Sequence, residues 1–302
     1  MTEKLLISII TPSLNRADMI EAAIESVLAQ NYPHFEHIIV DGGSTDGTLE
    51  HLKRYPHLKV LVDHDKGMYN ALNRGLELAK GEIIGFLNTD DQYADRVFAV
   101  VAEKFKNSKT MAVVGSAQVF VTTPDGEMQI IDNLSPESAS LIELSTLGNH
   151  IFNAWFFRRS VFEEIGNFNI EYRIVGDREF MLRFVLGNLH YEILNKQVYR
   201  YLQHDGSLTF NLSDQKYERI VNEHIKMTGY YLEQKELPQT ARALIQQLRT
   251  RETIKMTVIA AKTSMRKGYH FFIEGIKYDH QWPLRFVQKA FKYLKRTPRS
   301  PE

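Results

Sequence analysis

The first hundred residues of the chain alternate between two kinds of hydrophobic pattern, and this alternation limits the folds that are open to it. Short apolar runs rich in β-branched residues occur at 5–10, 36–40, 58–62 and 82–87, and amphipathic segments separate them. Runs of this length are typical of strands that helices cover on both faces. A repeated strand–helix–strand order predicts right-handed crossovers and a parallel sheet.

The segments between these strands have the period of helices. Apolar residues recur every three or four positions over residues 20–28, which predicts one amphipathic helix. A second helix is expected after Asp46 and should end at Pro56. A third is expected over residues 68–80, with Gly81 as its C-terminal cap.

Further strand and helix patterns continue up to residue 202. They predict, in order, a helix at 94–106, strands at 111–121 and 127–131 joined by a Pro-Asp-Gly turn, a strand and short helix within 154–166 that Gly166 ends, a helix at 178–187, and strands at 189–193 and 197–202. From about Ser213 the pattern is helical and polar, with a break at Pro238.

Composition excludes several classes of protein. The chain has 302 residues, of which 43% are hydrophobic and 11% aromatic, and this is enough for a large core. It has no cysteine, which excludes disulfides, thiolate metal sites and cysteine nucleophiles. The N-terminal apolar run is too short for a signal peptide or a membrane span, and no later run is long enough to cross a bilayer. We therefore expect a cytoplasmic protein.

Charge is distributed unevenly along the chain although its net value is zero. Residues 241–302 hold fourteen Lys or Arg and four Asp or Glu, a net charge of +10. Near the C-terminus one predicted helical face is apolar and its flanks are cationic. The apolar face has Leu284, Val287, Phe291 and Leu294, the flanks have Arg285, Lys289, Lys292, Lys295 and Arg296, and Trp282 lies at one end. This pattern suits an anionic membrane surface. It equally suits packing on the acidic body of the chain, residues 1–240, whose net charge is −10, or a homodimer; nucleic acid is not expected.

Polar residues follow the predicted strand 82–87. The sequence there is Asn88-Thr89-Asp90-Asp91. Mg²⁺ or Mn²⁺ held by one or two carboxylates characteristically fills its remaining positions with phosphate oxygens and water. The two acids therefore predict a metal site beside a phosphate ligand. Alternatively, Asp91 caps the following helix and Asp90 is solvated.

The first two predicted strands also end in polar residues. Thr11, Ser13, Asn15 and Arg16 offer donors and a fixed positive charge for phosphate or ribose. The segment DGGSTDGT, residues 41–48, brings Asp41 to a strand end, and Gly43 lets backbone approach a ligand closely. Alternatively, this segment is an ordinary turn before a helix that Ser44 or Asp46 caps. Ligands of open sheets bind beyond the carboxyl ends of strands where the winding reverses, so the groups meet if the first and fourth strands are neighbours.

These segments resemble a known family. TPSLNRADMIEAAIESVLAQNYPHFEHIIVDGGSTDGT and DKGMYNALNRGLELAKGEIIGFLNTDD are similar to the nucleotide-binding half of the family 2 glycosyltransferases, which are inverting enzymes with the GT-A fold. The resemblance covers about residues 5–95 and continues more loosely to about residue 210. It implies an α/β fold with a Rossmann-like, mostly parallel central sheet flanked by helices. Residues 1–210 would form the catalytic domain, with a nucleotide-binding half (1–95) and an acceptor half (96–210), and residues 211–302 a helical, basic C-terminal extension.

The resemblance also implies roles for individual residues. Asp41 would pair with the nucleotide base, commonly uracil, and Asp177 would be the general base. Asp90 and Asp91 match the end of the DxD motif, which binds Mn²⁺ or Mg²⁺ and the donor. The other expected nucleotide-binding residues are Thr11, Ser13, Asn15, Arg16, Gly43, Lys66, Asn70 and Asn88.

Alternatives stay open at several of these positions. Asp177 is also placed to cap the helix 178–187, and Glu179 is a second candidate for the base. Arg183 either orients Asp177 or lies on a helix surface, and His204 either reaches the diphosphate or is an exposed loop histidine. The residues that open the third helix either lie near the donor or form a solvated helix start; they are Lys66, Tyr69, Asn70 and Arg74.

The chain departs from the family pattern at three places. Asn88 stands where the DxD motif begins with Asp, and Gly176 replaces the acid that usually precedes the base. Phe152-Asn153 stands where relatives carry His-Gln or His-Pro, with His150 displaced by two residues. These changes concern the acceptor side more than donor binding.

The sequence therefore predicts metal-dependent, inverting transfer of a sugar from a nucleotide-sugar, most plausibly UDP-linked, to a hydroxyl of a glycan or lipid-linked glycan in surface polysaccharide synthesis. The alternative is a non-catalytic subunit that binds nucleotide-sugar. A dinucleotide oxidoreductase is excluded, because the first strand should then be followed by a glycine-rich loop and TPSLNR has no glycine.

Overall fold

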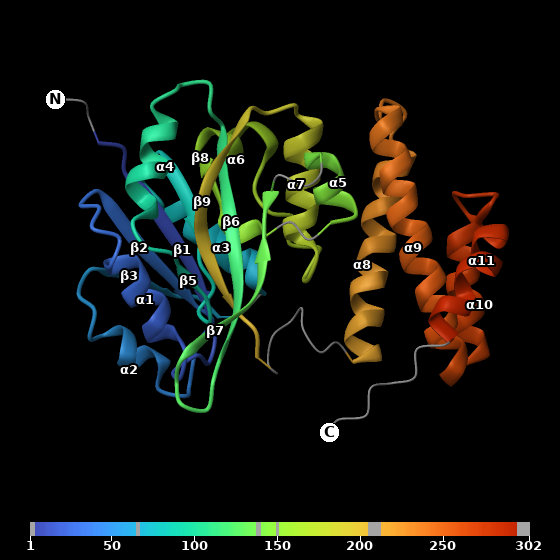
Figure 1. The fold of residues 1–302 in the computed structure, drawn as a ribbon, viewed down its shortest axis with the longest axis horizontal. Coiled ribbons are helices and arrows are strands. Elements are labelled where there is room, and N and C mark those ends of the chain that lie inside the picture. Colours follow the sequence, from blue (N-terminus) through green and yellow to red (C-terminus); the bar gives the residue numbers. More distant parts are fainter. Residues whose placement is uncertain (1–3, 65–66, 137–139, 149–150, 205–212, 295–302) are drawn as a thin grey trace. The chain divides into compact units, whose positions relative to one another are not determined.

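The computed structural model describes residues 4–64, 67–136, 140–148, 151–204 and 213–294, without the side chains of residues 144 and 290–294 (Figure 1). Lys66 and His150 therefore lie outside the described residues, as do the side chains of Phe291, Lys292 and Leu294 and all of Lys295 and Arg296. The chain divides into two compact units, one of Met1–Leu141 and Asn149–Phe210 and the other of Ile142–Gly148 and Asn211–Glu302.

Nine strands of the described chain form one sheet in the first unit, in the order β3-β2-β1-β4-β8-β6-β9-β5, with β7 paired to β6. They are β1 (Ile7–Ser13), β2 (Phe35–Asp41), β3 (Leu58–Val62), β4 (Ile83–Phe86), β5 (Gln92–Tyr93), β6 (Ala112–Thr122), β7 (Met128–Leu134), β8 (Trp155–Arg158) and β9 (Tyr191–Leu202). β1 pairs in parallel with both β2 and β4, and β2 with β3. The predicted α/β fold with a mostly parallel sheet is confirmed.

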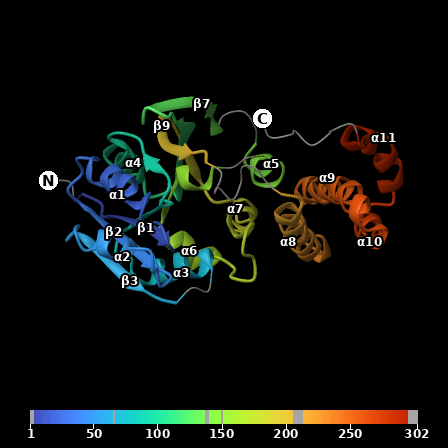
Figure 2. The same ribbon diagram turned by 90° about the horizontal axis from the view of Figure 1, so that it is seen from below.

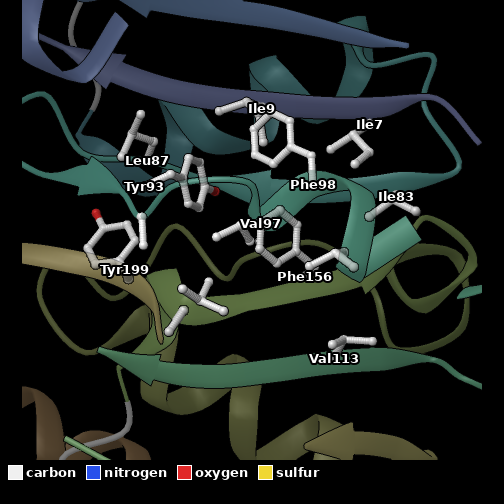
Figure 3. Packing of buried hydrophobic residues seen from close by; sticks show 14 of the residues in the cluster. Ile7, Ile9, Ile83, Leu87, Tyr93, Val97, Phe98, Val113, Phe156 and Tyr199 are labelled. Carbon is white, nitrogen blue, oxygen red and sulfur yellow. The ribbon is translucent and has the colours of Figure 1, made fainter. Parts of the chain in front are cut away.

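Helices cover both faces of this sheet. They are α1 (Ile20–Leu28), α2 (Thr48–Leu52), α3 (Met68–Leu78), α4 (Val97–Phe105), α6 (Ser160–Ile165) and α7 (Gly176–Leu186), with a short 3₁₀ turn at Phe152–Ala154. Alternate residues of β1 enter different cores, as expected of a strand buried on both sides. Ile7 and Ile9 pack with residues of α1 and α4 (Figure 3). Ile10 packs with residues of α3, α6 and α7, and α3 and α6 lie on the opposite side of the sheet from α1 and α4 (Figure 2).

Several element boundaries differ from the prediction. The two strands expected at 189–193 and 197–202 are one strand, β9, and the short β5 was not predicted. α2 ends at Leu52, before Pro56 is reached. Gly81 does not cap α3, which ends at Leu78. A Cβ at Gly81 would lie 2.7 Å from the backbone of Leu6 and Ser8, so this glycine lets the chain pass close to β1.

Other turn predictions are confirmed. Gly126 closes the β6–β7 hairpin with a φ of 84°, and Gly166 ends α6 with a φ of 80°. Both values lie in the left-handed region that glycine adopts without a steric cost. The helical region breaks at Pro238, which directly precedes α9.

The second unit is helical. It contains α8 (Asp214–Glu233), α9 (Gln239–Thr263), α10 (Met265–Ile276) and α11 (Trp282–Leu294), together with most of α5 (Leu141–Thr146). Arg251 of α9 donates to the carbonyl of Leu147, 2.9 Å away, just after α5. The fully buried Trp282 donates from Nε1 to Thr253 Oγ1 at 2.8 Å, so α11 is fastened to α9. None of the helices in the described ranges is long and apolar enough to cross a membrane.

Candidate active site

The carboxyl ends of three neighbouring strands form the candidate site. Ser13, the last residue of β1, pairs with Asp41, the last residue of β2. On the other side of β1, Ile10 pairs with Phe86, and the amide of Leu87 donates to the carbonyl of Ile10 at 3.1 Å. The first and fourth strands are therefore neighbours, as the prediction required, and residues 88–91 follow β4 beside the end of β1.

The loops that follow β1 and β2 are bound to each other. The backbone amide of Asn15 donates to Ser44 Oγ at 2.7 Å, and Asn15 Oδ1 accepts from the amide of Thr45 at 2.9 Å. Asn15 has a φ of 52°, in the left-handed region where asparagine is enriched. The amide of Arg16 donates to Thr48 Oγ1 at 2.8 Å. Asn15 thus joins the two loops, while the partly buried guanidinium of Arg16 has no ion-pair partner among the described residues.

Asp41 organises the turn that follows it. Its side chain is fully buried, Oδ1 accepts from the amides of Gly43 and Ser44 at 3.0 and 2.7 Å, and Oδ2 accepts from Ser44 Oγ at 2.7 Å. Gly43 has a φ of 92°, and a Cβ there would lie 3.1 Å from His64 Nδ1. Glycine at 43 is therefore required by backbone conformation. The contact of Asp41 with a nucleotide base stays a prediction.

Behind these loops lies a buried pair of polar residues. The hydroxyl of Thr11 is 2.9 Å from His37 Nε2, and both side chains are fully buried. Burial, and secondly the nearby His57, lower the pKa of His37 to about 3, so this imidazole is neutral at physiological pH. The hydroxyl of Ser13 is also buried, and it has no hydrogen-bond partner among the described residues.

Asp90 is paired with a histidine that follows β9. Oδ2 of Asp90 lies 3.0 Å from Nε2 of His204, which follows β9, and each side chain is 19% exposed. The alternative that His204 is an exposed loop histidine is therefore wrong. The sequence suggested that His204 could approach the diphosphate, but gave no indication that its partner is Asp90.

Asp91 has a different environment from Asp90. It is buried; Oδ2 accepts from Tyr199 Oη at 2.7 Å and from Asn88 Nδ2 at 3.0 Å, and Oδ1 accepts from the amide of Leu202 at 2.9 Å. Burial, and secondly the adjacent Asp90, raise the pKa of Asp91 to about 8. The bonds from Tyr199 and Leu202 fasten the loop after β4 to β9, and the bond from Asn88 closes the loop on itself. The alternative that Asp91 caps a helix is wrong, because Arg96 is the N-cap of α4.

Two potential ligands for a divalent cation lie at the place where the sequence predicted a metal site. The described residues contain no group of three or more His, Asp or Glu side chains that could hold a metal. Asp90 and His204 supply one carboxylate oxygen and one imidazole nitrogen, which fits a cation that completes its coordination with phosphate oxygens and water. Asp91, which already accepts three hydrogen bonds, fits this role less well than Asp90.

Asp177 lies in the first turn of α7, and Tyr69 of α3 holds its side chain. Tyr69 Oη is 3.1 Å from Asp177 Oδ1 and 2.9 Å from the carbonyl of Ile174. Asp177 is not an N-cap, since Val175 occupies that position without a side-chain bond. Tyr69 is 2% exposed, so it does not belong to a solvated helix start.

The missing acid at position 176 has a steric explanation. A Cβ at Gly176 would lie 2.8 Å from two ring carbons of Tyr69. The tyrosine ring therefore occupies the space that the side chain of a preceding acid would need. Tyr69 thus accounts both for the glycine at 176 and for the hydroxyl that contacts Asp177. The sequence did not predict this contact, because residues 69 and 176 are distant in the chain.

Glu179 and Arg183 form an ion pair on the same helix. Arg183 donates to both carboxylate oxygens of Glu179, at 2.8–3.1 Å, and to the carbonyls of Gly166 and Asn167 at 3.0 and 2.8 Å. Arg183 thus fastens the end of α6 to α7 and does not orient Asp177. The engagement of Glu179 in this pair favours Asp177 as the base.

The remaining predicted residues are less constrained. Asn70 is partly buried in the first turn of α3, and Arg74 donates to Asp63 Oδ2 at 3.1 Å after β3. The donor contact of Lys66 is untested, because this residue lies outside the described ranges.

Comparison with known proteins gives a consistent result. The sequence model of Glycosyl transferase family 2 matches residues 8–166. A PGL/p-HBAD biosynthesis glycosyltransferase from Mycobacterium bovis (strain BCG / Pasteur 1173P2) is 34% identical over 185 residues, which are 59% of this chain and 69% of the relative.

Solved structures have the same fold. S. aureus TarS matches with a TM-score of 0.65 at 17% identity, over 96% of this chain and 53% of that one, so the chain spans about half of that protein. TarS 1-349 in complex with UDP matches with a TM-score of 0.61 at 16% identity, over 94% of this chain and 92% of that one. The mannosyltransferase PcManGT from Pyrobaculum calidifontis, in complex with GDP-Man and Mn²⁺, matches with a TM-score of 0.59 at 17% identity, over 97% and 86% of the two chains.

Proposed function

The chain belongs to glycosyl transferase family 2 and is a glycosyltransferase, and on this premise we propose that it moves a sugar from a UDP-linked donor to a hydroxyl of a glycan or lipid-linked glycan, with inversion at the anomeric carbon. A cytoplasmic location and a role in surface polysaccharide synthesis are part of the proposal. The uracil base is supported by the bound UDP of TarS 1-349, while the GDP-Man of PcManGT makes guanine the base to test beside it.

The observation that carries the proposal is the pairing of Asp90 with His204 beyond the strand ends. We assign the donor diphosphate to this pair and the nucleoside to the ends of β1 and β2. Thr11, Ser13 and Asp41 lie there, and Arg16 offers its unpaired positive charge to phosphate. Asn15 contributes by joining the two loops through its side-chain oxygen, and Gly43 through its backbone conformation, rather than by direct contact with the donor.

A divalent cation, Mn²⁺ or Mg²⁺, is part of the proposal. Asp90 and His204 would hold it, and when bound it would neutralise charge on the departing nucleoside diphosphate. The Mn²⁺ of PcManGT supports a cation in this fold. We assign Asp91 to anchoring the loop to β9 through Tyr199 and Leu202, which revises the prediction that both acids are metal ligands.

Asp177 is the proposed general base. An acceptor hydroxyl is a weak nucleophile, and its proton must leave as its oxygen attacks the anomeric carbon. A carboxylate on the face opposite the leaving group takes that proton, and a single displacement inverts the configuration. Tyr69 holds the carboxylate through its hydroxyl.

Calorimetric titration of UDP, with and without Mn²⁺ and beside GDP, tests the donor site. We expect metal-dependent UDP binding and at least about tenfold weaker binding for Asp90→Asn. Asp95→Asn is the matched control, because Asp95 is an exposed acid that pairs only weakly with Arg200 at 3.5 Å. No binding of either nucleotide in either condition would refute the assignment of the strand ends to a donor.

Release of UDP from a panel of UDP-sugars tests the base. Asp177→Asn should lower turnover roughly 10²- to 10⁴-fold and leave UDP affinity unchanged. The alternative of a non-catalytic binding subunit is motivated by Asn88, which brings no charge to the position where the family has an acid. It predicts UDP binding without turnover in the unmodified protein.

A further inference from the structure

The most exposed large hydrophobic side chains of the described chain lie on two consecutive helices. Met265 and Tyr269 of α10 are 78% and 66% exposed, and Leu284 and Val287 of α11 are 69% and 62% exposed. No other large hydrophobic residue in the described ranges exceeds 58%. Exposed apolar residues scattered singly are normal, but a concentration of this kind marks an interaction site.

These residues form faces rather than isolated positions. Met265, Tyr269 and the 44% exposed Ile273 are spaced by four, which places them on one side of α10. Leu284 and Val287 are spaced by three on α11. The two helices lie side by side within the helical unit (Figures 1 and 2).

Internal packing does not use these faces. The bundle is filled from the other sides of the two helices, by Phe271 and by the fully buried Trp282. The ring of Trp282 stacks on Phe286 at 5.0 Å and meets Phe272 edge-on at 4.8 Å. Leu284 and Val287 therefore take no part in the internal packing of the helical unit.

Cations border the exposed faces. Arg266 and Lys277 are exposed at positions next to the stripe of α10, and Lys289 is exposed on α11. None of these three has an acidic partner among the residues that the structure describes. The surrounding segment, residues 241–302, has a net charge of +10, with fourteen Lys or Arg against four acids. A second copy would bring the same positive charge to this surface, which disfavours a homodimer through it.

We propose that α10 and α11 form a docking surface for an anionic lipid bilayer. Met265, Tyr269, Ile273, Leu284 and Val287 would enter the boundary between headgroups and acyl chains, and the bordering cations would contact lipid phosphates. None of the residues of this surface belongs to the proposed donor site or is the proposed base, so this proposal does not depend on the proposed sugar transfer.

Flotation of the full-length protein with vesicles tests this surface. We expect it to float with mixed phosphatidylglycerol–phosphatidylcholine vesicles, to float much less with phosphatidylcholine alone, and to be released by high salt. Leu284→Ser/Val287→Ser should bind the anionic vesicles at least about tenfold more weakly, because two buried aliphatic side chains are lost from the interface. Ile170→Ser is the matched control, since Ile170 is 57% exposed in the other unit and should float like the unmodified protein.

Other results would overturn the proposal. Absence of flotation with anionic vesicles, or undiminished flotation of the double variant, would do so. So would light scattering that shows a dimer which Leu284→Ser/Val287→Ser converts to a monomer, combined with no vesicle binding. UDP titration of the double variant checks that the protein is folded, and it separates a failure of this surface from a failure of the donor site.

Discussion

At the scale of single residues, the candidate base depends on a contact between two distant positions. Tyr69 fills the space beside Gly176 and directs its hydroxyl to Asp177. A hydrogen bond of this kind contributes about 1 kcal/mol to stability, but its larger effect here is to fix where the carboxylate oxygen lies. Tyr69 is thus a positioning residue for the proposed reaction.

Removing the hydroxyl of Tyr69 should separate catalysis from donor binding. We expect Tyr69→Phe to lower kcat about tenfold while UDP affinity stays the same, because the carboxylate of Asp177 loses a partner and the strand ends do not. Steady-state kinetics and calorimetry measure the two effects. Tyr32→Phe is the control: it removes a hydroxyl that donates to the carbonyl of Leu5 at 2.6 Å, and kcat should not change. Equal kcat in all three proteins would show that Tyr69 has no role in positioning.

His37 should make the first unit less stable in mild acid. Its pKa falls from about 6.5 to about 3 in the folded protein, so below pH 6.5 the unfolded chain binds a proton that the folded chain does not. The free energy of unfolding that depends on neutral His37 is fully present above pH 6.5 and is lost progressively as the pH falls toward 3. Relative to His37→Gln, we expect the unmodified protein to lose about 2 kcal/mol between pH 7 and pH 5, and urea denaturation of both proteins at the two pH values measures it; the raised pKa of Asp91 acts in the opposite direction but is common to both proteins and cancels in the comparison. Parallel pH profiles for the unmodified protein and His37→Gln would contradict this account.

The sequence suggested the acids of the candidate site but not their hydrogen-bond partners. Asp41, Asp90, Asp91 and Asp177 stand out because polar residues directly follow apolar runs or begin a helix. The partners His204, Tyr199 and Tyr69 come from elements 100 or more residues away, and their hydrogen bonds depend on tertiary packing. Single-sequence periodicity reports local structure and has no means of pairing such positions.

At the scale of elements, the parallel half of the sheet was predictable and the mixed half was not. β1, β2 and β4 are buried along nearly their whole length, so each contains a short apolar run, whereas β3 is a partly exposed edge strand that was recognisable from its Val and Leu residues. β9 is mostly half-buried and has polar Asn195-Lys196-Gln197 in the middle, which divides its pattern into two apparent strands. β5 has two residues, too few for any periodicity.

The junction of α6 and α7 depends on one guanidinium. Arg183 bonds Glu179 and three carbonyls at the end of α6, including that of Ile165, and its fork-shaped geometry is what allows this. Arg183→Lys keeps the charge and should still cost about 1–3 kcal/mol of unfolding free energy, because several carbonyls lose their donor. Arg54→Lys should cost less than about 1 kcal/mol, since that arginine is 64% exposed in its pair with Glu21. If urea denaturation showed equal losses of unfolding free energy for the two variants, Arg183 would not be what joins α6 to α7.

At the scale of the whole molecule, the division into units is not the same as the division at residue 210. Ile142–Gly148 belongs to the helical unit although residues on both sides of it belong to the sheet unit. Within this unit, Arg251 of α9 donates to the carbonyl of Leu147 just after α5. The sequence could not indicate it, because a six-residue helix carries too little pattern to reveal which core it joins.

Truncation tests this division. Residues 1–213 alone should aggregate or melt at lower temperature than the same segment with Ile142–Gly148 replaced by Gly and Ser, because α5 keeps its apolar residues and loses its partners. Each kcal/mol of difference corresponds to a melting shift of roughly 2–4 °C in a chain of this size. Identical melting and solubility of the two shortened chains would show that α5 does not depend on the C-terminal helices.

Because Ile142–Gly148 belongs to a unit whose other helices come later in the chain, it is synthesised before its packing partners. Residues 142–148 leave the ribosome before any of α8, which begins at Asp214, has been made. At about 5–20 residues per second, the wait is roughly 3–13 seconds. A helix of this length is not stable alone in water, so α5 waits as an apolar stretch of nascent chain. The sheet unit must therefore fold while residues 142–148 still lack their packing partners. We expect this segment to be where a chaperone binds the nascent chain.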